Sequence, residues 1–165
     1  MKKTQYITYA ALIAALYVLL TYVSNIFGLA SGAIQFRISE ALTILPIITS
    51  AAIPGLTIGC LVANILTGCT LIDIIFGSFA TLLGAIGTYL IGKLHMRRKE
   101  YLAPIPPIFF NTLIIPFVLA VSLPQESVWF IMLTVFIGEF LSCSIPGILL
   151  YKALMRRAFS KSNDK

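Results

Sequence analysis

The chain has 165 residues, of which 59% are hydrophobic and only 11% are charged, and its mean hydropathy is +0.97. Soluble domains are about half apolar and about a quarter charged, so this composition excludes an ordinary soluble domain. We expect an all-α integral membrane protein with a single domain over residues 1–165. The net charge of +6 would by itself also suit a nucleic-acid-binding protein.

Six apolar segments predict a compact bundle of six transmembrane helices, in chain order about 5–24, 38–52, 55–67, 71–93, 104–121 and 127–150. The first segment is longer than the apolar run of a signal peptide, so we expect it to be retained. Pro54 and Gly55 predict a break between the second and third segments, which are short and could form one hairpin. The loop 25–36, which contains Gly28 and Gly32, is a candidate mobile lid.

The basic residues predict the orientation of this bundle. With six helices, both ends of the chain lie on one side of the membrane, together with the loop after the fourth segment. That side holds eleven of the twelve basic residues, namely Lys2, Lys3, Lys93, Arg97, Arg98, Lys99, Lys152, Arg156, Arg157, Lys161 and Lys165. The positive-inside rule then predicts that both termini are cytoplasmic. Because the excess charge lies in short loops and a tail, we expect no nucleic-acid partner.

Several polar residues lie in or beside the apolar segments, where an ionisable group costs roughly 2.5–3.5 kcal/mol and therefore indicates function. They are Arg37, Glu40, Asn64, Asp73, Asn111 and Glu139. The first four lie towards the outer side and the last two lie deeper, which favours an outward-opening pocket over a continuous pore. The alternative is that Arg37 pairs internally with Glu40 or Asp73 and only holds helices together.

The composition of this polar set favours a particular ligand chemistry. Its acidic groups outnumber Arg37, which favours a cation, or a heterocycle edge with several N–H donors such as that of guanine, over a simple anion. Five aromatic residues could stack on a flat ring or serve only packing, namely Tyr22, Phe36, Phe109, Phe110 and Trp129. The cysteines and the single histidine show no metal-binding spacing, so we expect no metal or cofactor. The chain has no phosphate-binding GxxxxGK[ST] loop, so uphill transport requires an ion gradient or a separate ATPase.

The first segment carries two pairs of small residues at a spacing of four, Ala10 with Ala14 and Ala11 with Ala15. Such pairs let helices approach closely in lipid, so this segment is a candidate docking surface for a partner helix. The spacing is common in membrane bundles, and internal packing is the alternative.

Three strings resemble the queuosine-precursor transporter family: "FRISEALTILP" at 36–46, "TGCTLIDIIFG" at 67–77 and "GEF" at 138–140. This family is a branch of the substrate-binding (S) components of energy-coupling factor transporters, and the resemblance covers essentially the whole chain. It implies a bacterial cell-membrane subunit without enzymatic activity of its own. The implied ligand is a 7-deazaguanine, either the aminomethyl precursor, the cyano precursor or queuine. The implied partners are a transmembrane coupling protein, which Ala10, Ala11, Ala14 and Ala15 would contact, and two cytoplasmic ATPase subunits.

For such a ligand, Glu139 or Glu40 could accept the ring N–H and the exocyclic amine, and Asp73 could hold a cationic aminomethyl group. Arg37 could donate to the ring carbonyl or hold Glu40 in position, and Asn111 could donate and accept. Three alternatives remain: an ion-coupled carrier that works alone, an S component for another vitamin, and a membrane enzyme. The last is disfavoured because no histidine or nucleophile motif accompanies the carboxylates.

Overall fold

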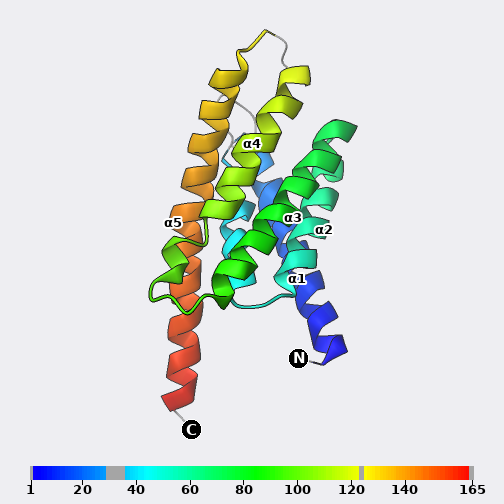
Figure 1. Cartoon of the computed structure of the whole chain (residues 1–165). Coiled ribbons are helices and arrows are strands. Elements are labelled where there is room, and N and C mark those ends of the chain that lie inside the picture. Colours follow the sequence, from blue (N-terminus) through cyan, green and yellow to red (C-terminus); the bar gives the residue numbers. More distant parts are fainter. Residues whose placement is uncertain (1, 29–35, 123–124, 164–165) are drawn as a thin grey trace.

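The computed structural model describes residues 2–28, 36–122 and 125–163, and the described chain is an all-helical bundle (Figure 1). Its helices, in order, are α1 (Lys3–Ile26), η1 (Ile38–Ile47), α2 (Ala52–Leu66), α3 (Leu71–Lys93), η2 (Lys99–Tyr101), α4 (Ile105–Ser122) and α5 (Val128–Asn163). Within these residues, α1, α3, α4 with the preceding η2, and α5 are long and apolar enough to cross a membrane, whereas η1 and α2 are shorter. The chain is therefore a multi-pass membrane protein.

The long helices begin and end close to the expected residues, except at the end of α5. Helix α5 continues beyond residue 150 through the basic stretch to Asn163. Residues 148–163 contain no glycine or proline and are rich in Leu, Ala, Met, Lys and Arg, which favour helix. The change from apolar to basic composition thus marks the edge of the apolar segment and not the end of the helix.

The second expected segment is a ten-residue 3-10 helix, η1, and it does not form a regular spanning α-helix. At about 2.0 Å per residue it is about 20 Å long, shorter than the ~30 Å hydrocarbon layer. Pro46, inside η1, lacks an N–H and disfavours helical geometry at the residue before it. The chain turns at 48–51, and Pro54 lies in the first turn of α2, where an unpaired backbone nitrogen costs nothing.

Helix η1 lies inside the bundle, in contact with α1, α2, α3 and α5. Residues 39–44 of η1 are all buried, including Ser39, Glu40 and Thr43. Irregular backbone at membrane depth is tolerated where protein surrounds it, and Thr43 satisfies its hydroxyl within η1 by donating to Glu40 O at 2.6 Å. The surrounding helices thus allow η1 to carry polar side chains into the interior.

Small residues set the distance between α1 and α2. A Cβ added at Gly55 would lie 2.8 Å from Ala10 O, and one added at Gly59 would lie 3.1 Å from Ala14 Cα. Ala10 and Ala14 therefore pack against α2 within the chain, as expected of small residues in lipid. Ala11 and Ala15 lie on the exposed face of α1. The structure thus separates the two alanine pairs that the sequence could not distinguish.

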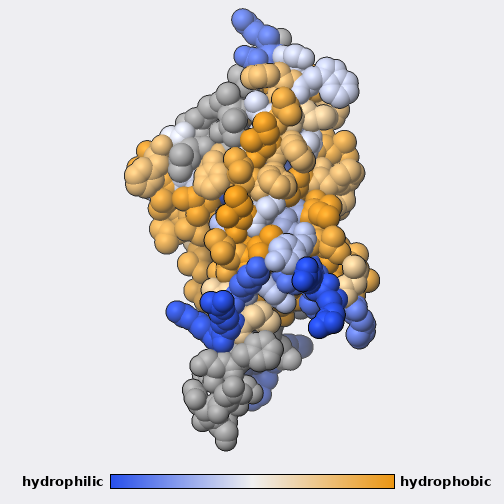
Figure 2. All heavy atoms as spheres, turned by 90° about the vertical axis from the view of Figure 1, so that its left-hand side faces the viewer, coloured by the Kyte–Doolittle hydropathy of each residue, from blue (hydrophilic) through white to orange (hydrophobic). Residues whose placement is uncertain are grey.

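Both ends of the described chain lie at the lower end of the bundle in Figure 1, the end at which α3 connects to α4. The first residue of η1, Ile38, lies beside the end of α1, where its N–H donates to Ser24 Oγ. The last residue of η1, Ile47, packs on Gly92 near the end of α3. Although η1 is short, it runs in the direction expected of a second spanning helix, so the chain reverses direction after each of its helices from α1 to α5. Figure 2 shows a hydrophobic band across one face, with hydrophilic groups above and below it.

Candidate ligand pocket

A small polar cavity lies where η1, α2, α3, α4 and α5 meet. Its volume is about 30 Å³, which is on the order of a single water molecule. Its polar lining consists of Arg37, Glu40, Cys60, Thr81, Asn111 and Glu139. Four of the six residues singled out from the sequence therefore meet at one place, although they come from η1 or its start, α4 and α5.

Glu40 is only 3% exposed, and its two carboxylate oxygens have different surroundings. The hydroxyl of Tyr17, a fully buried residue of α1, donates to Glu40 Oε1. Among the residues that the structure describes, Oε2 has no hydrogen-bond partner. A buried carboxylate oxygen without a donor is costly, so this oxygen is suited to receive a donor from a ligand.

One face of α1 holds η1 in place through three polar residues. Besides Tyr17, Thr21 Oγ1 donates to Ser39 Oγ at 2.8 Å, and Ser24 Oγ accepts from Ile38 N at 2.9 Å. The spacing of four and then three residues places these side chains on one helical face. These three residues were not among those singled out from the sequence, although polar residues at this spacing in an apolar helix were a usable signal.

Arg37 approaches the cavity from the start of η1 and is held by neutral groups. Its Nη1 donates to Asn64 Oδ1 at 3.4 Å, and its backbone N–H donates to Ser142 Oγ on α5 at 3.2 Å. The described part of the chain contains no salt bridge from Arg37 to Glu40 or Asp73. The guanidinium therefore retains donors that are not committed to a carboxylate.

Asn64 lies behind Arg37 and does not itself line the cavity. It is 2% exposed, and its Nδ2 contacts Cys60 Sγ at 3.6 Å. A Cβ added at Gly77 of α3 would lie 3.1 Å from the same Nδ2. Gly77 therefore leaves the space that Asn64 needs to reach Arg37.

Glu139 faces Glu40 across the cavity. A carboxylate oxygen of each residue and the Sγ of Cys143 all lie within 4.8 Å of one another, and Cys143 donates to Glu139 Oε2 at 3.4 Å. Two carboxylates at this separation repel each other unless a proton or a cation lies between them. These three groups are spaced so that they could ligate a metal ion, and they would equally accept donors from a cationic or N–H-rich ligand.

Asp73, which was singled out from the sequence, does not line this cavity. It lies in the first turn of α3, where its N–H donates to Thr70 Oγ1 at 3.2 Å and its Oδ2 accepts from the same hydroxyl at 2.6 Å. A carboxylate at a helix N-terminus is stabilised locally by the cap and the helix dipole, so its presence there needs no ligand.

The five candidate stacking aromatics also lie outside the cavity lining. Tyr22, Phe109 and Trp129 are exposed on the surface of the bundle, and Trp129 is 78% exposed. Such positions suit contact with lipid or with the membrane interface. They leave the described cavity without an aromatic platform.

A bundle of apolar helices that encloses a small charged cavity is the arrangement of a membrane transport protein for a small solute. The chain belongs to the QueT transporter family, whose family model matches residues 7–156. It is 40% identical over 80 residues to "Queuosine precursor transporter QueT" of Lactococcus lactis subsp. cremoris (strain MG1363). These 80 aligned residues cover 48% of this chain and 47% of that relative. The alignment thus spans about half the length of the curated relative. No solved structure matches this chain significantly. The family expected from the sequence motifs is confirmed.

Proposed function

We propose that this chain is the substrate-binding subunit of an energy-coupling factor importer and that it captures a 7-deazaguanine queuosine precursor from outside the cell. The observation that carries the proposal is the cavity in which Glu40 and Glu139 face each other beside Arg37 and Asn111. This set offers acceptors for the N–H groups of a guanine-like edge and donors for its carbonyl oxygen. The family and the printed name of the relative agree with this ligand class.

The two carboxylates take different roles in this proposal. Tyr17 already occupies Oε1 of Glu40, so Glu40 offers its Oε2 to a single donor such as the ammonium of an aminomethyl group. Glu139, which is hydrogen-bonded by the side chains of Asn111 and Cys143, accepts the ring N–H and the exocyclic amine together. Arg37 donates to the ring carbonyl. Glu40 thus takes the role of binding the cationic aminomethyl group, which the sequence had suggested for Asp73.

Binding must widen the site, because a flat bicyclic ring is several times larger than the water-sized cavity. Arg37 is the side chain that we expect to move, since the hydrogen bond that its guanidinium makes within the described residues is a long one, 3.4 Å to Asn64. The guanidinium would then stay paired with the ring carbonyl, with Glu139 on the N–H side of this carbonyl and Glu40 on the aminomethyl side.

For energy, this chain would depend on a transmembrane coupling protein and two cytoplasmic ATPase subunits in the bacterial cell membrane. The clustering of basic residues supports cytoplasmic termini by the positive-inside rule. Ala11 and Ala15 form the small-residue face that is free for docking, whereas Ala10 and Ala14 pack on α2. We therefore assign the docking role to Ala11 and Ala15.

A binding experiment with the purified chain tests this proposal. Calorimetry should detect the aminomethyl and cyano precursors and should detect neither adenine nor thiamine. Glu40→Gln should weaken the aminomethyl precursor more than the cyano precursor, because only the former carries the ammonium, whereas Glu139→Gln should weaken both. Binding of another vitamin in place of the deazaguanines would contradict the ligand assignment.

A second candidate, an ion-coupled carrier that works alone, is favoured by the Glu40–Glu139 pair, which can exchange a proton. Liposomes that contain only this chain, with a proton gradient imposed across them, distinguish the two. The importer-subunit proposal expects ligand binding without accumulation, and accumulation inside these liposomes would favour the carrier.

A further inference from the structure

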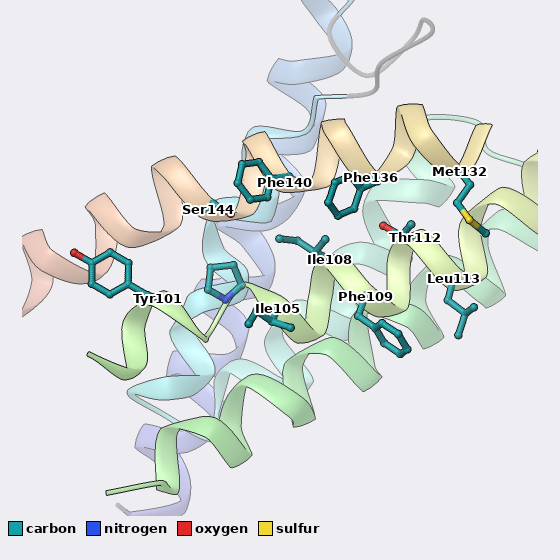
Figure 3. Close-up of a pocket in the computed structure, with 11 residues that line it drawn as sticks. Tyr101, Ile105, Ile108, Phe109, Thr112, Leu113, Met132, Phe136, Phe140 and Ser144 are labelled. Atoms are coloured by element: carbon teal, nitrogen blue, oxygen red, sulfur yellow. The ribbon is translucent and has the colours of Figure 1, made fainter. Parts of the chain in front are cut away.

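A second, larger hollow lies on the outside of the bundle between α4 and α5. This α4–α5 groove has a volume of about 500 Å³ and shares no lining residue with the polar cavity. Its walls are mainly apolar, with Ile108 and Phe109 on α4 and Phe136 and Phe140 on α5 (Figure 3). Phe109 and Phe140 are each about half exposed, so the groove opens to the surroundings of two helices that can cross a membrane. Its volume is in the range of small-molecule sites, about 300–1,000 Å³.

The groove has the length of one membrane leaflet. From Ser144 at one end to Met132 at the other, α5 advances twelve residues, or about 18 Å at 1.5 Å per residue. Half of the hydrocarbon layer is about 15 Å thick. Figure 3 shows Tyr101 and Met132 at opposite ends of the groove. A single acyl chain laid along the groove would therefore reach from the membrane surface to about the midplane.

Only one end of the groove carries positive charge. Lys152 Nζ donates to the hydroxyl of Tyr101 at 3.1 Å and lies 5.2 Å from the centre of its ring. Arg156 follows one helical turn later on α5, and both cations are exposed. Neither forms a salt bridge within the described residues, although Glu100 is adjacent to Tyr101 in the chain. The Tyr101 end thus has two exposed cations beside it, of which Lys152 contacts only the neutral side chain of Tyr101 among the described residues.

A neighbouring groove of similar size lacks the tyrosine that Lys152 contacts. The hollow between α3 and α4 is of similar size, about 540 Å³, and is lined by residues such as Phe76, Phe79 and Phe117. Neither groove has a cation among its lining residues, and the two differ in that the α4–α5 groove includes Tyr101, which Lys152 contacts. Lipid chains of any kind can cover that hollow, whereas the α4–α5 groove adds a charge that selects among headgroups.

We infer that the α4–α5 groove is a binding site for an anionic phospholipid, whose acyl chain lies along Ile108, Phe136 and Phe140 and whose phosphate pairs with Lys152 and Arg156. The apolar channel supplies the contact area and the two cations supply the preference for negative headgroups. Each basic residue near an anionic headgroup contributes on the scale of a fivefold change in affinity. This site is independent of the ligand proposed for the polar cavity.

Native mass spectrometry of the detergent-purified full chain tests this inference, with phosphatidylglycerol and phosphatidylcholine of equal chain length added in competition. The parent should prefer phosphatidylglycerol, and the Lys152→Ala/Arg156→Ala double variant should lose at least fivefold of that preference. Lys93→Ala is the matched control, because Lys93 also lies over a tyrosine ring, at 4.5 Å from the centre of Tyr89, but Tyr89 does not line the α4–α5 groove. It should retain the parent's preference.

Two further measurements distinguish lipid binding in the groove from attraction of the headgroup by surface charge alone. Ser144→Phe fills the Tyr101 end of the groove and should reduce phosphatidylglycerol binding although both cations remain. Glycerol 1-phosphate, which has the phosphate without the chain, should not displace the lipid. An unchanged preference in the double variant, an equal loss in Lys93→Ala, or displacement of the lipid by glycerol 1-phosphate would each overturn the inference.

Discussion

Replacement of Tyr17 by phenylalanine removes one hydroxyl at the centre of the molecule. Tyr17 is fully buried and Glu40 is 3% exposed, so bulk water does not reach Glu40 Oε1 to replace the lost donor. A hydrogen bond to a charged group contributes about 1.5–3 kcal/mol. For a chain of 165 residues, about 2–4 °C of melting temperature corresponds to each kcal/mol, so we expect a decrease of about 3–12 °C.

Thermal unfolding of the purified chain in detergent measures this decrease, and Tyr22→Phe on the exposed face of α1 is the matched control. A double-mutant cycle isolates the contact, because Tyr17→Phe should cost little once Glu40 has been replaced by alanine. The reasoning fails if Tyr17→Phe melts with the parent, or if its cost is the same in the presence and absence of Glu40.

Three other substitutions test separate parts of the account. Gly59→Ala places a Cβ 2.8 Å from Tyr17 Cβ and should destabilise the chain by about 1–3 kcal/mol; a melting temperature equal to the parent's would argue against this packing. Ala15→Leu should leave ligand affinity within twofold but abolish co-purification with the coupling protein and ATPases, and intact assembly would exclude this face as the docking surface. Asp73→Asn should leave ligand affinity within twofold in calorimetry, because Asp73 caps α3 outside the cavity. A tenfold loss of affinity would instead indicate that Asp73 contacts the ligand.

Hydropathy predicted α1, α3, α4 and the apolar part of α5 because each is an uninterrupted apolar run long enough to cross a bilayer. It could not identify η1 as a short 3-10 helix. A segment enclosed by four helices and a segment surrounded by lipid are both apolar in sequence, and only the tertiary contacts of η1 distinguish them.

The polar cavity was predictable in outline because charged residues are rare and costly in this composition. Arg37, Glu40, Asn111 and Glu139 line it together, with Asn64 directly behind Arg37. Tyr17 was not predicted, since a tyrosine in an apolar helix has the same local signature whether it faces lipid or a buried carboxylate.

Asp73 shows the opposite limitation. Its charge suggested a site residue, but its position three residues after Thr70 makes it part of a helix cap. The Thr70–Asp73 spacing before an apolar run is the pattern of a capping box, so this local partner was a usable signal in the sequence. The carboxylates that meet in the cavity, Glu40 and Glu139, lie 99 positions apart in the chain, and only the fold brings them together.

The most direct test of the central claim is the affinity of the purified chain for the aminomethyl 7-deazaguanine precursor when Glu139 is replaced by glutamine. Glu126→Gln, a change of an exposed glutamate outside the cavity, is the matched control. The account predicts measurable binding by the parent and by the control, and at least a tenfold weaker affinity for Glu139→Gln. Equal affinity in all three proteins, or no binding by the parent, would contradict it.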